Sequence, residues 1–379
     1  MTADLGHGVP EPATTAATGG RPEGHLGAAG PAPQVVLNLA RPWGEADPLD
    51  LAGAALGAGL DGVTLADSPR LFPDCLLETG RILANTGARL AGPCVLSLGL
   101  RHPATVAGAL GTLAAHHPGR LLAVVGRGES SVRNEGLAVP SLRTHRESLD
   151  RLRELLDDRA PELRLLGAAS GPRTIRATAA RLGGVLVDVG ADPAVLGKAV
   201  RLVRAERPEA EIWVFLRAVL TRTAAEADAA GRPVLGSCAS RLVRAPDWYD
   251  LPAELLPRVE AVAAAHDYRR HGTPAARGGA GRSPETERLV RDRFLLTGDE
   301  RRIAGQLAAV RGLGVDGVVL AGALTGVVER LNKLATAVRA GLAIDPAVRT
   351  GPAADPAAGP AVRHRPDRRG RNLSAESEE

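Results

Sequence analysis

Short apolar runs alternate with longer stretches of helix-forming residues along most of this chain. The runs are rich in Val, Leu and Ile and lie at residues 35–39, 62–67, 89–95, 121–128, 163–170, 184–190, 212–219 and 317–321. Ala, Leu and Arg fill the stretches between them, and Pro48, Pro103, Pro172 and Pro193 stand where a helix would begin. Strand-like runs separated by helices predict parallel pairing, because each return to the same edge of a sheet needs a connection of helical length.

The number of runs favours a closed α/β barrel. Eight strand–helix units in about 300 residues are typical of a (β/α)8 TIM barrel. A doubly wound open sheet is the alternative, but it would more often have fewer strands and a Gly-x-Gly-x-x-Gly after the first one, which this sequence lacks. The sequence therefore predicts one barrel over residues 34–344.

Three segments fall outside this rhythm. Residues 221–293 contain two or three helical pieces and a loop rich in Gly, Pro and Arg, and we interpret them as an insertion after the seventh strand. The insertion either helps to enclose the site or is a solvent-facing elaboration. Residues 1–33 and 345–379 hold few periodic apolar positions, so both are predicted to be disordered tails.

Composition narrows the class of function. The net charge of +4 comes almost wholly from Arg and is spread along the chain among Asp and Glu, so we expect no nucleic-acid partner. Cys75, Cys94 and Cys238 are isolated from one another and from His, which argues against a metal site and fits a reducing cytoplasm. No apolar stretch of about 18 residues is present, so no membrane partner is expected.

The ends of the second and third predicted strands carry unusual residues. Asp67 and Ser68 close the second strand, where a carboxylate would face the barrel mouth or cap the next helix. The third strand contains Gly-Pro before Cys94 and Val95. Because Pro donates no hydrogen bond to a ladder, this strand is predicted to have a bulge or other special backbone geometry.

The fourth and fifth strands end in loops suited to an anion. Arg127, Gly128, Glu129, Ser130 and Ser131 follow the fourth strand, and their hydroxyl, guanidinium and backbone N–H groups can bind phosphate. Glu129 is also a candidate acid or base. The alternative interpretation is a polar turn with an exposed charge.

After the fifth strand come Ala169, Ser170, Gly171, Pro172 and Arg173 at the start of a predicted helix. Free N–H groups at a helix N-terminus, with a hydroxyl and a guanidinium beside them, make an anion site. Helix capping alone would also explain these residue types. Two such loops on neighbouring strands predict a cofactor with a phosphate at one end and a planar ring over strands two to four.

These motifs resemble those of the bacterial luciferase-like superfamily, in particular its branch of deazaflavin (coenzyme F420)-dependent oxidoreductases. The matching stretches run in order from about residue 35 to 340 and include Ala66-Asp67, Gly92-Pro93-Cys94-Val95, Gly126-Arg127-Gly128-Glu129, Ala169-Ser170-Gly171-Pro172, and residues 59–63, 101–103, 118–120, 293–300 and 314–318.

The resemblance implies a specific site. It implies a non-prolyl cis peptide between Cys94 and Val95 where the cofactor ring rests, Asp67 beside the ring, Glu129 as the acid that protonates substrate, and residues 170–172 near the cofactor phosphate. It also implies a homodimer. Ser68 stands where the related sugar-phosphate dehydrogenases carry a catalytic His, which argues against sugar oxidation.

The sequence thus predicts a cytoplasmic F420-dependent oxidoreductase that moves a hydride to or from a small organic substrate. Glu129 is the predicted proton donor, Asp67 orients the ring, and Ser68 is a secondary candidate. The substrate walls are predicted to come from the loop of Trp43 and from the insertion 221–293, including Trp248, Tyr249 and His271. The alternatives are an FMN-dependent monooxygenase and a non-catalytic flavin-binding barrel.

Overall fold

The computed structural model describes residues 32–41, 46–270, 283–321 and 328–343. The two predicted tails lie outside these residues, except for Ala32 and Pro33, and so do Trp43 and His271. Within the described part of the chain, no helix combines the length and the apolar character needed to cross a bilayer.

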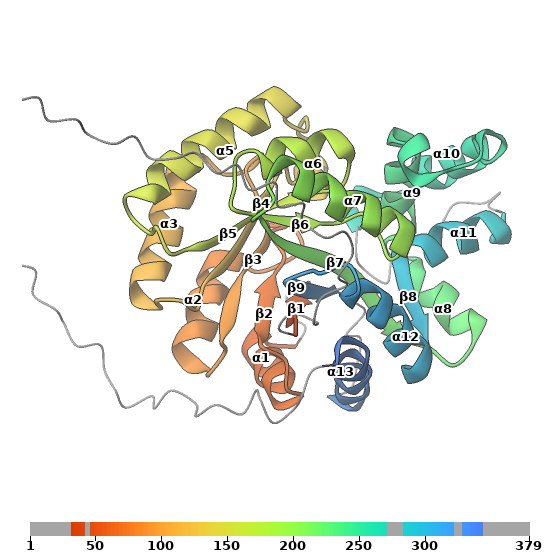
Figure 1. Ribbon diagram of the computed structural model, residues 1–379, viewed down its shortest axis with the longest axis horizontal. Helices are drawn as coiled ribbons and strands as arrows, with labels where there is room; N and C mark the ends of the chain where they lie inside the picture. The colour runs from red at the N-terminus through yellow and green to blue at the C-terminus, as the bar shows by residue number, and fades with distance from the viewer. Residues whose placement is uncertain (1–31, 42–45, 271–282, 322–327, 344–379) are drawn as a thin grey trace, which may run out of the picture. The chain divides into compact units, whose positions relative to one another are not determined.

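Nine parallel strands form one sheet, and eight of them close into a barrel (Figure 1). The strands are β1 (Gln34–Leu39), β2 (Gly62–Leu65), β3 (Leu90–Ser97), β4 (Leu122–Gly126), β5 (Arg164–Ala169), β6 (Gly184–Val187), β7 (Glu211–Leu220), β8 (Leu295–Gly298) and β9 (Gly317–Ala321). Strands β1 to β6 pair in sequence, β6 pairs with β7, and β9 pairs with both β7 and β1. The predicted (β/α)8 barrel is confirmed, and each predicted run contains one barrel strand.

Strand β8 is the element that the periodicity did not reveal. It pairs with the last four residues of β7, beyond the part of β7 that closes the barrel on β6. It has only four residues and follows a helix directly at Phe294, so no turn signal marks its start.

Helices connect the strands. They are α1 (Pro48–Gly57), α2 (Cys75–Asn85), α3 (Pro103–His116), α4 (Glu129–Asn134), α5 (Leu142–Asp157), α6 (Pro172–Ala179), α7 (Pro193–Glu206), α8 (Ala224–Gly231), α9 (Leu235–Arg244), α10 (Leu256–Ala264), α11 (Pro284–Phe294), α12 (Glu300–Arg311) and α13 (Val328–Leu342), with short 3-10 turns η1 (Asp247–Tyr249), η2 (Ala253–Leu255) and η3 (Tyr268–Arg270). Pro48, Pro103, Pro172 and Pro193 each stand in the first helical turn, as predicted.

The segment between β7 and β8 is richer in helix than the sequence indicated. It holds α8, α9, α10 and α11, which gather beside β8 (Figure 1). Its Gly/Pro-rich loop lies mostly outside the described residues.

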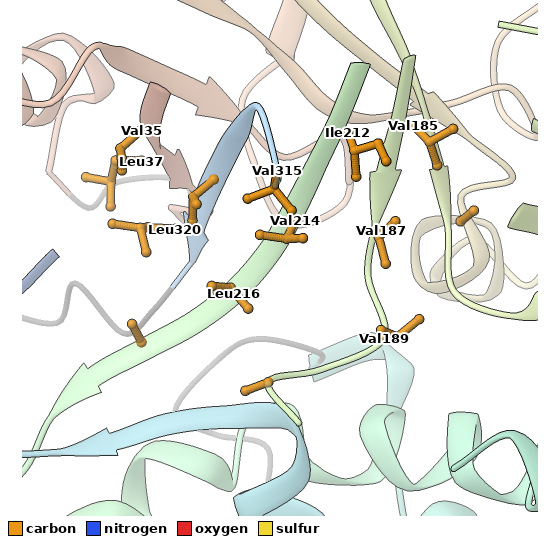
Figure 2. Close-up of a cluster of buried hydrophobic side chains, with 14 of the residues drawn as sticks. Val35, Leu37, Val185, Val187, Val189, Ile212, Val214, Leu216, Val315 and Leu320 are labelled. Atoms are coloured by element: carbon orange, nitrogen blue, oxygen red, sulfur yellow. The ribbon is translucent and has the colours of Figure 1, made fainter. Parts of the chain in front are cut away.

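Alternate residues of each strand enter two separate apolar layers. On β7, Val214 and Leu216 face outward into the layer between barrel and helices (Figure 2), whereas Trp213 and Phe215 face the barrel interior. The interior layer consists of Val36, Leu90, Cys94, Leu122, Val124, Leu166, Leu186, Trp213, Phe215 and Val319. The barrel is therefore a packed core beneath its mouth, and the mouth is where a ligand can enter.

Trp213 is the largest side chain in this interior and is fully buried. Its indole nitrogen donates to Glu211 Oε1 at 2.6 Å. A Cβ built on Gly317, at the start of β9, would lie 2.3 Å from the indole, so glycine is needed there to leave room for the ring.

We expect Trp213→Ala to lower the free energy of unfolding by about 3–5 kcal/mol, because it removes a large buried side chain and leaves a cavity. Chemical denaturation monitored by circular dichroism measures the change. Leu77→Ala is the control, since Leu77 is 76% exposed and its truncation should change stability by less than about 0.5 kcal/mol. Equal stability of wild type and Trp213→Ala would contradict a filled barrel interior.

Candidate functional site

A cavity of about 770 Å³ opens at the carboxyl ends of the barrel strands. Its walls come from β1 to β7 and β9 or the loops after them, and from helices α8 and α9. Every site residue predicted from the sequence lines this one cavity: Asp67, Ser68, Cys94, Val95, Arg127, Gly128, Glu129, Ser130, Ser131, Ala169, Ser170, Gly171, Pro172 and Arg173. Of the aromatic substrate-wall residues predicted in the described part of the chain, Trp248 and Tyr249 do not line it.

Asp67 is buried and already satisfied by protein groups. Its Oδ1 accepts from Arg101 Nη2 at 2.9 Å, and its Oδ2 accepts from Arg101 Nε at 3.2 Å and from the Ser97 backbone N–H at 2.9 Å. The same Arg101 also reaches Asp74. Asp67 therefore ties the loop after β2 to the end of β3, and its place beside a cofactor ring stays a prediction.

The peptide between Cys94 and Val95 is cis, as the resemblance implied. The pairing of β3 with β4 shifts register between Cys94 and Leu96, so the predicted irregularity of this strand is confirmed. Burial raises the pKa of the Cys94 thiol, and the charge of Asp188 raises it further. Cys94 is therefore a neutral, apolar part of the wall and not a nucleophile.

The loop after β4 depends on Gly128, which has a φ of 71°. A Cβ on this residue would lie 1.7 Å from Ser97 Oγ, so only glycine lets the loop approach β3 this closely. Beside it, Arg127 Nε donates to the Pro140 carbonyl at 3.0 Å. Gly128 and Arg127 together hold the start of α4 at the cavity wall.

Glu129 begins α4 and forms ion pairs with two guanidinium groups. It contacts Arg244 of α9 closely, and Arg133 Nε lies 3.4 Å from its Oε1. The Glu129 carboxylate thus joins the loop after β4 to the helical segment between β7 and β8. Its side chain keeps 26% of its surface exposed, so a ligand in the cavity can reach it.

The N-terminus of α6 opens into the same cavity. Gly171 is its N-cap, and no described side chain caps the helix. The Ser170 carbonyl accepts from the Tyr249 hydroxyl at 3.2 Å, which holds the loop in place. Arg173 is exposed beside this helix start. The free N–H groups and the guanidinium make the loop after β5 suited to an anion.

An ion-pair cluster in the mouth was not predicted from the sequence. It consists of Asp188, which follows β6, Arg217 on β7 and Arg241 on α9. Arg241 Nη1 and Nη2 donate to the two carboxylate oxygens of Asp188 at 2.5 Å each, and Arg217 Nη1 donates to Oδ1 at 3.2 Å. Burial alone would raise the pKa of Asp188, but the two guanidinium groups lower it to about 2. The three residues are far apart in sequence and share no motif; the only signal was Asp188 directly after the sixth strand.

His145 lies on α5 with 1% of its surface exposed, and neither ring nitrogen has a hydrogen-bond partner among the described residues. Burial, with the nearby charges of Arg127 and Arg181, lowers its pKa to about 4. The imidazole is therefore neutral in the folded protein at neutral pH.

Comparison with known families gives a match over the first part of the chain. The family described as luciferase-like monooxygenase matches residues 25–157, which confirms the resemblance to the luciferase-like superfamily. No curated protein matches the chain.

Solved structures with this fold cover most of the chain. A coenzyme F420-dependent tetrahydromethanopterin reductase from Methanopyrus kandleri is 14% identical, with a TM-score of 0.61 over 81% of this chain and 98% of its own. An F420-dependent secondary alcohol dehydrogenase is 17% identical and has a TM-score of 0.58; the match covers 81% of this chain and 99% of its own. The oxygenating constituent of 3,6-diketocamphane monooxygenase from Pseudomonas putida, in complex with FMN, is 16% identical, with a TM-score of 0.52 over 81% and 98%. At these identities the likeness is one of fold.

We expect His145→Leu to change the pH dependence of stability. The unfolded chain takes up a proton on His145 near pH 6.5, whereas the folded protein resists protonation down to about pH 4, so wild-type stability falls by about 3 kcal/mol as the pH drops through this window. The variant lacks this contribution and keeps all others. Denaturation of both proteins from pH 7.5 to 4 should show that wild type loses about 3 kcal/mol more stability than the variant, and parallel curves would contradict a neutral buried imidazole.

Proposed function

We propose that this chain, which has the fold of luciferase-like oxidoreductases, is an F420-dependent enzyme that transfers a hydride to or from a small organic substrate. The observation that carries the proposal is the single cavity that gathers all the residues assigned to the cofactor from the sequence. Two solved structures with this fold carry F420 dependence in their names. As part of the proposal we retain a cytoplasmic homodimer.

The walls fit a deazaflavin in size and in chemistry. A cavity of about 770 Å³ is within the range of cofactor sites. Ser170, Arg173 and the uncapped start of α6 offer donors for a phosphate, and Ser130 lies on the neighbouring loop. Cys94 and Val95 supply an apolar wall on which a planar ring could rest.

When bound, the deazaflavin would supply or accept the hydride, and the chain's own residues would set position and protonation. Asp67 keeps Arg101 and the end of β3 in place, and Arg127 fixes the loop of Gly128. Glu129 is the most exposed carboxylate among the described cavity residues and could hold or move a proton at its Oε atoms.

The relatives in fold include an FMN-bound enzyme, so FMN is the competing cofactor in every test. We expect purified protein to bind F420 saturably and more tightly than FMN. Arg173→Gln should weaken F420 binding about tenfold, because one charge-assisted hydrogen bond to phosphate is lost. Fluorescence titration of both cofactors measures this.

The matched control is Arg176→Gln, one turn further along α6, where Arg176 pairs with Glu206 and does not line the cavity. Its F420 affinity should equal that of wild type. Tighter binding of FMN than of F420, or no binding of F420, would overturn the cofactor assignment.

We expect Glu129→Gln to lower turnover about 100-fold with F420 binding changed less than about threefold, since a general acid contributes rate more than affinity. The assay follows F420 absorbance with a substrate found from a panel of alcohols, enones and 2-oxo acids. Arg244→Gln breaks the same ion pair and keeps the carboxylate, so it should lose much less activity. Equal losses in the two variants would assign Glu129 to positioning alone.

A further inference from the structure

In the cluster of Asp188, Arg217 and Arg241, Arg217 lies on β7, across the barrel from the Cys94–Val95 wall, whereas Asp188 follows β6, the neighbour of β5. The strands follow one another around the mouth as β1 to β7 and then β9. Counted in either direction, β7 is four strands away from β3. Arg217 on β7 therefore faces the Cys94–Val95 side of the mouth from the opposite wall. Of the two loops suited to phosphate, the one after β4 is next to β3, and the one after β5 is two strands from both β3 and β7.

This cluster has a surplus of positive charge. Two guanidinium groups share the single carboxylate of Asp188, and neither has an ion pair with any other described residue. The side chains are mostly buried, at 12% exposed for Arg217 and 18% for Arg241. An enclosed charge without a counterion is unfavourable, so the cluster is complete only when a negative group joins it.

The two arginines differ in what they have left to offer. Arg241 uses both terminal nitrogens on Asp188, with a further bond from Nη1 to the Asp188 carbonyl, and so fastens α9 to the end of β6. Arg217 makes one longer bond, from Nη1, and its Nε and Nη2 donate to no other described residue. Both of these free donors belong to a residue that lines the cavity.

The surroundings of Arg217 hold its guanidinium in the barrel mouth. Its guanidinium carbon lies 4.8 Å from the centroid of the Phe215 ring, which gives a cation–π contact below it. On the adjacent strand the residue in register is Ala321, whose small side chain leaves the neighbouring space open. Phe215 and Ala321 line the cavity with it.

We propose that Arg217 binds a carboxylate of the substrate, so that the substrates are small organic monoacids. The proposal rests on the proposed function, since it assigns the cofactor to the β3 side and the substrate to the β7 side. A planar guanidinium edge donates two parallel hydrogen bonds to a carboxylate. A surplus of one charge matches a monoanion, and Asp188 with Arg241 holds Arg217 in place to receive it.

The test is calorimetric binding of matched acid and neutral probes to the full chain without cofactor. The pairs are benzoate with benzyl alcohol, butyrate with butanol, and pyruvate with acetone. We expect at least one acid to bind wild type ten times more tightly than its neutral partner. Arg217→Gln should lower the affinity for that acid at least ten-fold and leave the affinity for the neutral probe unchanged. Arg176→Gln should bind both probes as wild type does.

Arg217→Lys keeps the positive charge beside Asp188 but lacks the planar pair of donors. It should therefore keep the protein folded and still bind the acid several-fold more weakly than wild type. The proposal is overturned if no acid outbinds its neutral partner, or if both Arg217 variants keep wild-type acid affinity. It is also overturned if Arg217→Gln weakens F420 binding ten-fold and leaves acid binding intact, because the charge would then serve the cofactor. Arg217-dependent acid binding without any F420 binding would instead defeat only the proposed function.

Discussion

Closure of eight parallel strands around a filled interior is the constraint on which the remaining structure depends. Trp213 and Phe215 belong to the packed barrel interior, and the closed strands bring their carboxyl ends together in one ring. Residues far apart in the sequence, such as Asp67 and Asp188, therefore meet at one mouth. The cavity lies at these strand ends, above the apolar interior, and polar side chains from the strand ends and the following loops line it.

Ion pairs then determine which polar groups remain available to a ligand. Asp67 forms an ion pair with Arg101, and Arg241 forms one with Asp188. Among the described residues of the lining, Glu129 keeps 26% of its side chain exposed although it pairs with Arg133 and Arg244, and Arg173 and Arg217 have donors that no described residue uses. The cavity therefore has loops suited to an anion after β4 and β5, an apolar wall at Cys94 and Val95, and Arg217 opposite that wall, which under the proposals above would suit a redox cofactor and an acidic substrate.

Much of the fold and of the site was predictable, because both depend on local patterns. Alternating apolar runs reveal buried strands, and glycines with hydroxyl residues after strands, as at Gly128 and Ser170, reveal loops that approach a ligand. The cluster around Arg217 could not be found this way, because its three residues join only when β6, β7 and α9 come together in space. Strand β8 was missed since it follows α11 directly, with no turn signal at its start. The bond of Asp67 to Arg101 could not be predicted either, because the two residues are 34 positions apart.

The most direct test of the account is the visible absorption spectrum of the protein purified from a host that makes both F420 and FMN. The account predicts a bound deazaflavin, released on denaturation in a ratio near one per chain. A bound FMN spectrum would show that the cavity selects the other cofactor and would contradict the central claim.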